Sequence, residues 1–120
     1  MHLKKMLKRF RDNYIIRQVE NIKFPEFPDE VPIRVRADFY GKVQNVGFRY
    51  EVYLLARRLE LTGWVENAST GEVMAEFQGS RQKILFLIDF MKSLIRARVD
   101  KVETLEIDVI TSEDRFLIIK

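Results

Sequence analysis

The fold is decided by one stretch, Gly41-Lys42-Val43-Gln44-Asn45-Val46-Gly47-Phe48-Arg49. Residues 33–40 alternate between apolar and polar types before it, which predicts a strand with one buried face. Apolar residues at helical spacing follow it and predict a helix. A loop that enters a helix N-terminus can bind an anion, because unpaired backbone N–H groups and the helix dipole both favour negative charge. Arg49 in the first helical turn adds a planar set of donors that suits phosphate oxygens.

Two segments of the chain together resemble the signatures of the acylphosphatase family. The pattern Gly41-x-Val43-Gln44-x-Val46-x-Phe48-Arg49 is similar to the first signature, G-x-V-Q-G-V-x-F-R. The second, G-W-V-x-N with a glycine turn after it, is similar to Gly63-Trp64-Val65-Glu66-Asn67 followed by Gly71. The resemblance covers about residues 33 to 119. It implies an enzyme, an acylphosphatase, that cleaves the carboxyl-phosphate bond of acyl phosphates to a carboxylate and inorganic phosphate.

The resemblance also implies roles for individual residues. The expected phosphate-binding residues are Gln44, Asn45, Val46, Gly47, Phe48 and Arg49, the first five through backbone N–H groups. The expected catalytic residues are Arg49 and Asn67, with Asn67 orienting the attacking water. We expect no metal and no cofactor. A carboxyl-phosphate anhydride releases a stable carboxylate, so phosphoryl transfer then depends mainly on positioning and charge stabilisation.

The other reactive residues exclude several alternative phosphatase mechanisms. The chain has no cysteine, so it has neither a thiolate nucleophile nor disulfides. His2 is the only histidine and lies far from both motifs. Asp38 has no second acid close to it in the sequence, and no Walker-type phosphate loop occurs. Mechanisms through phosphohistidine, aspartyl phosphate or a two-metal centre are therefore not expected.

Two positions depart from the family pattern. Asn45 stands where the first signature has glycine; asparagine is the best substitute if that position needs positive φ, and reduced activity is one expectation. Glu66 stands where many members carry a basic residue. By strand alternation, Glu66 is expected to point to the face opposite Asn67.

Taken singly, the same residues permit plainer interpretations. Arg49 at a helix start is compatible with a solvated surface residue, and Asn67 beside a turn with a turn former. Gln44 fits a hydrogen-bonding loop residue better than a catalyst. Trp64 is expected in the core.

The remaining pattern predicts an α+β fold, a ferredoxin-like split βαβ sandwich with the order β-α-β-β-α-β and a short terminal strand. Two helices are expected on one face of an antiparallel sheet. Gly63 is expected just beyond the end of the first helix, and Ser80 as the N-cap of the second. The last two strands are expected at residues 105–109 and 116–119. This domain spans residues 33–120.

Residues 1–32 are predicted to form a separate region. A helix over about residues 3–21 carries Leu3, Met6, Leu7, Phe10 and Tyr14 at helical spacing, and Ile15, Val19 and Ile22 are expected to continue this apolar stripe. The linker from Phe24 to Pro32 then holds all three prolines. Residues 1–23 have a charge balance of +5, so the rest of the +3 chain sums to −2. A basic amphipathic helix of this kind fits a membrane, a partner, a second copy or the chain's own domain.

Composition sets the remaining expectations. With 47% hydrophobic and 32% charged residues, the chain is typical of a soluble globular protein. No apolar run approaches a membrane span, no signal peptide is evident, and a cytoplasmic location is expected. No basic surface for nucleic acid is expected on the body of the protein. The alternative function is a weakly active or inactive anion-binding module whose N-terminal helix engages a partner or membrane.

Overall fold

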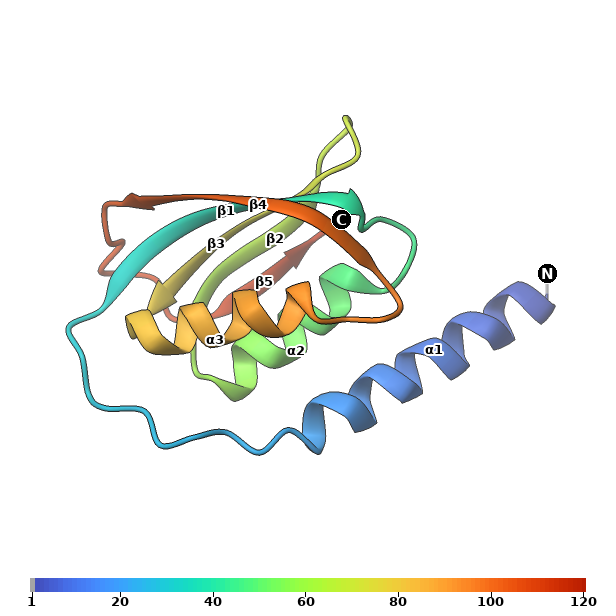
Figure 1. Ribbon diagram of the computed structural model, residues 1–120, viewed down its shortest axis with the longest axis horizontal. Helices are drawn as coiled ribbons and strands as arrows, with labels where there is room; N and C mark the ends of the chain where they lie inside the picture. The colour runs from blue at the N-terminus through green and yellow to red at the C-terminus, as the bar shows by residue number, and fades with distance from the viewer. Residues whose placement is uncertain (1) are drawn as a thin grey trace.

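Strand β1 (Ile33–Lys42) is an interior strand of the sheet, because it is paired along both edges. In the computed structural model, which describes residues 2–120, it pairs antiparallel with β3 (Val73–Gly79) and with β4 (Arg98–Ile107). On the far side of β3, β2 (Thr62–Asn67) pairs antiparallel with it and parallel with β5 (Phe116–Ile119). The resulting five-stranded order is β4-β1-β3-β2-β5 (Figure 1).

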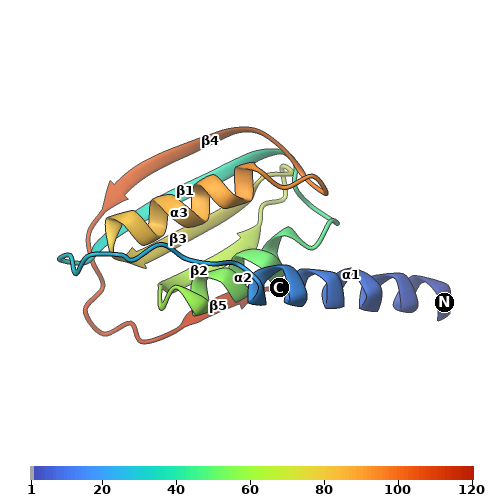
Figure 2. The same ribbon diagram turned by 60° about the horizontal axis from the view of Figure 1, so that its bottom comes forward.

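Helices α2 (Phe48–Arg58) and α3 (Arg81–Lys92) cover one face of this sheet (Figure 2). The inward strand residues are buried against them, and the rings of Phe39 and Phe48 lie 5.2 Å apart. Ser80 caps α3, since its hydroxyl accepts a hydrogen bond from the Lys83 N–H at 3.3 Å. The predicted order of elements, the ferredoxin-like arrangement and this N-cap are confirmed. The expected antiparallel sheet is instead mixed, because the terminal strand β5 runs parallel to β2.

The end of α2 differs from the prediction. The helix ends at Arg58, and Glu60 rather than Gly63 takes the left-handed conformation, with φ 59°. The turn is closed by the Leu61 N–H, which donates to the Ala56 carbonyl at 2.8 Å. Gly63 already belongs to β2, where a Cβ would overlap the Glu76 carbonyl of β3. Glycine is therefore required there by close strand approach and not by the helix end.

Two other predictions are wrong in detail. β4 begins at Arg98 and ends at Ile107, so Val109 lies outside it. As an edge strand with mostly exposed side chains, β4 lacks the strong apolar alternation that marks a buried strand. Trp64 is half-buried but not part of the core; it lies on the face away from the helices, where the Arg36 guanidinium is 5.4 Å from its ring centroid.

Helix α1 (His2–Glu20) contacts the body only through its C-terminal part. Ile15 and Val19 are buried in the common hydrophobic core beside α2. With about 100° of rotation per residue, they point roughly 140° away from the stripe of Leu3, Met6, Leu7, Phe10 and Tyr14. The expected single stripe is thus two stripes on different faces. The N-terminal turns project beyond the body (Figures 1 and 2).

The linker after α1 is extended, as predicted, and it is docked on the domain. The rings of Phe24 and Phe27 pack edge-on against Phe86 of α3 at 5.3 and 5.7 Å. Arg58 closes the end of α1, because its Nη1 donates to the carbonyls of Val19 and Ile22 at 2.6 and 3.1 Å. These contacts hold α1 against α2.

Candidate active site

The loop between β1 and α2 turns through two residues with positive φ, Asn45 at 63° and Gly47 at 77°. Gly47 is the N-cap of α2 and has no side-chain cap. Asn45 therefore stands at a position of positive φ, the condition under which asparagine is the best substitute for glycine. Within residues 2–120, the backbone N–H groups of residues 44–47 donate no hydrogen bond to another protein group. Such a loop at a helix N-terminus has the donors and the dipole needed to bind an anion.

The Gln44 side chain anchors this loop to the β2–β3 hairpin. Its Nε2 donates to the carbonyl of Ala68 at 2.7 Å and to that of Glu72 at 3.0 Å. Ala68 directly follows Asn67, so the bond brings the loop to the end of β2. The interpretation of Gln44 as a hydrogen-bonding loop residue is confirmed.

Arg49 approaches the same corner from the first turn of α2. It is half-buried, and its Nη1 donates to the Ile119 carbonyl at 2.7 Å. Ile119 is the register partner of Glu66, which directly precedes Asn67. Arg49 and Asn67 therefore lie at one corner of the sheet, and Arg49 is held in place rather than freely solvated. Its remaining donors make no hydrogen bond within the described residues.

Asn67 ends β2 on the face that α2 covers, the same face as the buried Val65. Its Oδ1 is buried, and no group in residues 2–120 donates a hydrogen bond to it. A buried acceptor without a partner is rare in native structures and is typical of a site that binds water or ligand. Glu66 points to the opposite face by strand alternation, as expected.

A charged pair lies behind the loop, and the sequence motifs do not include it. Arg96, between α3 and β4, donates through Nε to the Val46 carbonyl and through Nη2 to Glu51 Oε1, both at 2.6 Å. Glu51 is fully buried in α2, and burial raises the pKa of its carboxyl while the hydrogen bond and charge of Arg96 oppose that rise. The sequence did contain one indication of this pair: Glu51 is an acidic residue among the apolar residues of α2 that face the core.

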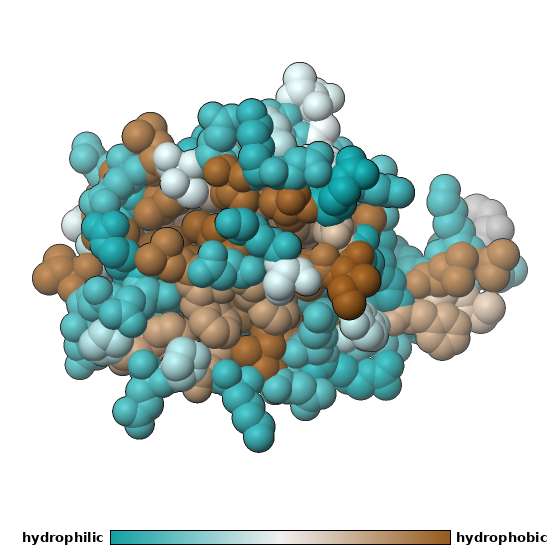
Figure 3. Space-filling model, in the orientation of Figure 1, coloured by the Kyte–Doolittle hydropathy of each residue, from teal (hydrophilic) through white to brown (hydrophobic). Residues whose placement is uncertain are grey.

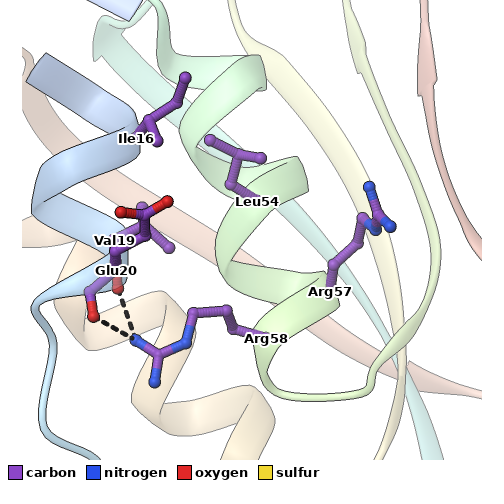
Figure 4. Close-up of a pocket in the computed structure, with 6 residues that line it drawn as sticks. All are labelled: Ile16, Val19, Glu20, Leu54, Arg57 and Arg58. Atoms are coloured by element: carbon purple, nitrogen blue, oxygen red, sulfur yellow. Dashed lines mark hydrogen bonds between the residues drawn. The ribbon is translucent and has the colours of Figure 1, made fainter. Parts of the chain in front are cut away.

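A separate hollow of about 340 Å³ lies between α1 and α2 (Figure 4). Its walls are formed by Ile16, Val19, Glu20, Leu54, Arg57 and Arg58. These residues adjoin the C-terminal end of α2, whereas the loop and Arg49 are at its N-terminal end. Arg58 is already bonded to α1, so this hollow is distinct from the motif residues.

The described part of the chain, residues 2–120, offers neither a metal cluster nor a membrane-spanning helix. No group of three or more His, Cys, Asp or Glu side chains in this range is arranged to hold a metal ion. No helix in the range is both long and apolar enough to cross a membrane.

The molecule is a ferredoxin-like α+β sandwich in which the loop after the first strand, Arg49 and Asn67 meet at one corner of the sheet. The family model for acylphosphatase matches residues 35–118. The chain belongs to the acylphosphatase family.

Relatives and solved structures agree with this assignment. The acylphosphatase of Clostridium beijerinckii is 38% identical over 87 residues, covering 72% of this chain and 97% of the relative. That of Salinibacter ruber is 41% identical over 88 residues, covering 69% and 85%. The crystal structure of acylphosphatase from Bacillus subtilis superposes with a TM-score of 0.69 at 28% identity, covering 73% of this chain and 99% of that one. The chain is an acyl phosphate hydrolase by family and by fold.

Proposed function

We propose that this chain hydrolyses acyl phosphates at the corner formed by residues 44–48, Arg49 and Asn67. The observation that carries this assignment is the buried, unpaired Oδ1 of Asn67 beside a loop whose N–H groups are also unpaired. The loop and Arg49 supply donors for the phosphoryl oxygens, and Asn67 supplies an acceptor for water. Both parts are needed for in-line attack on a bound phosphate.

In the proposed reaction, the water oxygen bonds to phosphorus while the bond from phosphorus to the carboxylate oxygen breaks. The N–H groups of residues 44–48 and the Arg49 guanidinium hold the three phosphoryl oxygens and stabilise their charge. Asn67 Oδ1 accepts a hydrogen bond from the attacking water. An amide does not take up a proton at neutral pH, so the water proton passes to a phosphate oxygen. The leaving carboxylate needs no general acid.

Phosphate release from benzoyl phosphate in the presence of EDTA tests this proposal. We expect hydrolysis to be insensitive to EDTA and to thiol reagents, and inorganic phosphate to inhibit competitively. Activity that is lost on chelation and restored by a divalent cation would contradict the metal-free mechanism. Phosphate binding without hydrolysis would instead favour an anion-binding module.

We further propose that the projecting part of α1 contacts an anionic membrane surface, with residues 1–32 as an N-terminal region and 33–120 as the catalytic domain. Its apolar stripe is 47–65% exposed at Leu3, Met6, Leu7, Phe10 and Tyr14, and Figure 3 shows apolar side chains on this projection. Lys4, Lys5, Lys8, Arg9 and Arg11 precede the first acid, Asp12. Asp12 is within ion-pair distance of Lys8 and Arg11, and the excess of cations leaves the segment positive. An exposed apolar stripe on a positive segment suits anionic headgroups and opposes pairing with the same segment of a second copy. A cytoplasmic location stays a prediction.

Vesicle binding by the full chain tests this contact. We expect sedimentation with phosphatidylcholine vesicles that contain phosphatidylglycerol, release by added salt, and no binding to pure phosphatidylcholine. The double variant Leu7→Glu, Phe10→Glu should not sediment but should keep hydrolysis. Failure of the native chain to bind, together with a concentration-dependent dimer that the double variant abolishes, would assign the stripe to a second copy instead.

A further inference from the structure

Arg96 is hydrogen-bonded both to the loop between β1 and α2 and to Glu51. Arg96 is the only side chain among residues 2–120 that donates a hydrogen bond to the Val46 carbonyl, at 2.6 Å. The same guanidinium holds Glu51 Oε1 at 2.6 Å. Glu51 is fully buried, and Arg96 is 20% exposed. The pair therefore connects three segments: the loop, the first turn of α2 and the connection from α3 to β4.

The bond to Val46 determines the direction of the next N–H group. In a trans peptide, the carbonyl of one residue and the N–H of the next point in opposite directions within one plane. A Val46 carbonyl held on Arg96 therefore directs the Gly47 N–H to the opposite side, into the loop. Val46 lies between Asn45 and Gly47, both at positive φ, so no regular secondary structure fixes the orientation of this peptide.

Glu51 determines where Arg96 lies. Its carboxylate is in the first turn of α2, close to the anion site, where an uncompensated negative charge would repel phosphate. Arg96 neutralises that charge and is oriented by it. Glu51 Oε2 is buried without a partner among the described residues, so Arg96 is its sole bonded cation.

We propose that Arg96 is a positioning residue for acyl phosphate hydrolysis: it aligns the Gly47 N–H with the phosphoryl group by holding the Val46 carbonyl, and Glu51 orients Arg96. Arg96 touches no reacting atom. This inference rests on the proposed function of the loop. It adds a residue outside both sequence motifs to the site.

Kinetics of Arg96→Ala and Arg96→Lys test the inference on the full chain. We expect Arg96→Ala to lower kcat/KM for benzoyl phosphate about ten-fold and to weaken competitive inhibition by inorganic phosphate. A misaligned Gly47 N–H weakens the hydrogen bond both to bound phosphate and to the transition state. Lysine keeps the charge but does not span both acceptors, so it should restore only part of the loss. Arg98→Ala is the matched control, because Arg98 is exposed and bonded only to Asp100.

Two further measurements separate positioning from folding. The double variant Arg96→Met, Glu51→Gln removes both charges and so avoids an unpaired buried carboxylate; it should fold and show the same loss as Arg96→Ala. In the native chain, the Gly47 amide resonance should shift on addition of inorganic phosphate, and that shift should shrink in the double variant. This readout does not require hydrolysis, so it remains valid if the native chain proves inactive. A folded double variant with native kcat/KM and a native Gly47 shift would overturn the inference.

Discussion

The loop between β1 and α2 and helix α1 lie in contact at Gly47, yet the loop is specified by its backbone and the helix by its side chains. A Cβ on Gly47 would lie 2.6 Å from Ile15 Cδ1 and 3.0 Å from Arg11 Nε, so α1 packs directly on the loop. In the proposed mechanism the loop acts through backbone N–H groups, whose directions are set by φ values and by the hydrogen bonds that hold the loop. Helix α1 acts through side chains, some buried in the core and some exposed. This contrast predicts that catalysis and stability respond separately to substitutions a few ångströms apart.

The largest effect is expected at Arg49. Arg49→Ala removes a charged donor that acts on phosphate in both ground and transition states, so kcat/KM should fall about 1000-fold and phosphate affinity should also drop. Steady-state kinetics with benzoyl phosphate measure both. Arg57→Ala, at the far end of the same helix, is the control and should retain native kinetics. A loss of less than ten-fold in Arg49→Ala would remove its assigned role.

On the other side of the contact, Ile15→Ala should change stability far more than rate. Ile15 is fully buried, so the substitution leaves a cavity and should lower the free energy of unfolding by about 3 kcal/mol. Urea denaturation measures this, and kcat/KM should stay within a few-fold of native below the transition. Leu7→Ala, at an exposed position of the same helix, should change stability by less than about 0.5 kcal/mol. Native stability in Ile15→Ala would show that α1 is not part of the folded core in solution.

Asn67 tests the division of roles inside the site. Asn67→Ala should lower kcat about 100-fold while inorganic phosphate still binds, because Asn67 is assigned to water and not to phosphate. Glu66→Gln is the matched control, since it changes the neighbouring residue on the other face of β2. If Asn67→Ala keeps native kcat, or if Glu66→Gln loses as much activity, the assignment of the water acceptor is wrong.

The sequence predicted the parts of the fold and site that are encoded locally. The N-cap at Ser80 depends on a few neighbouring residues, and so does the position of the Asn45 loop between a strand and a helix. The predicted end of α2 is wrong because Glu60 adopts the left-handed conformation that glycine usually takes past a helix C-terminus. The nearest glycine in the sequence is Gly63, and the prediction therefore placed the helix end there.

The parts that failed depend on distant contacts. Trp64 faces away from the core because it alternates with the buried Val65; the general preference of tryptophan for the core pointed the other way, and the contact with Arg36 comes from a different strand. The bond from Arg96 to Glu51 joins residues 45 positions apart, and no spacing rule connects them. The unpaired Oδ1 of Asn67 is likewise visible only once the loop and β2 are placed side by side.

The smallest effect is expected at Asn45, where the backbone conformation favours glycine but the residue carries a side chain. Asn45 has φ 63°, which glycine adopts without strain and asparagine at a cost of about 1 kcal/mol. Its exposed side chain makes no hydrogen bond within the described residues, so nothing in the loop depends on it.

Asn45→Gly should therefore keep the fold and raise kcat/KM for an acyl phosphate a few-fold, because about 1 kcal/mol of transition-state binding corresponds to about five-fold in rate. Its effect on stability should be small, since relief of strain is offset by the greater freedom of glycine in the unfolded chain. Asn45→Ala is the informative control: it removes the amide but keeps a Cβ, and alanine tolerates positive φ less well than asparagine, so activity should fall. A rise with glycine and a fall with alanine would show that the backbone conformation limits this loop. A fall with both would mean that the Asn45 amide itself contacts the substrate, and the loop would then act through a side chain as well as through its N–H groups.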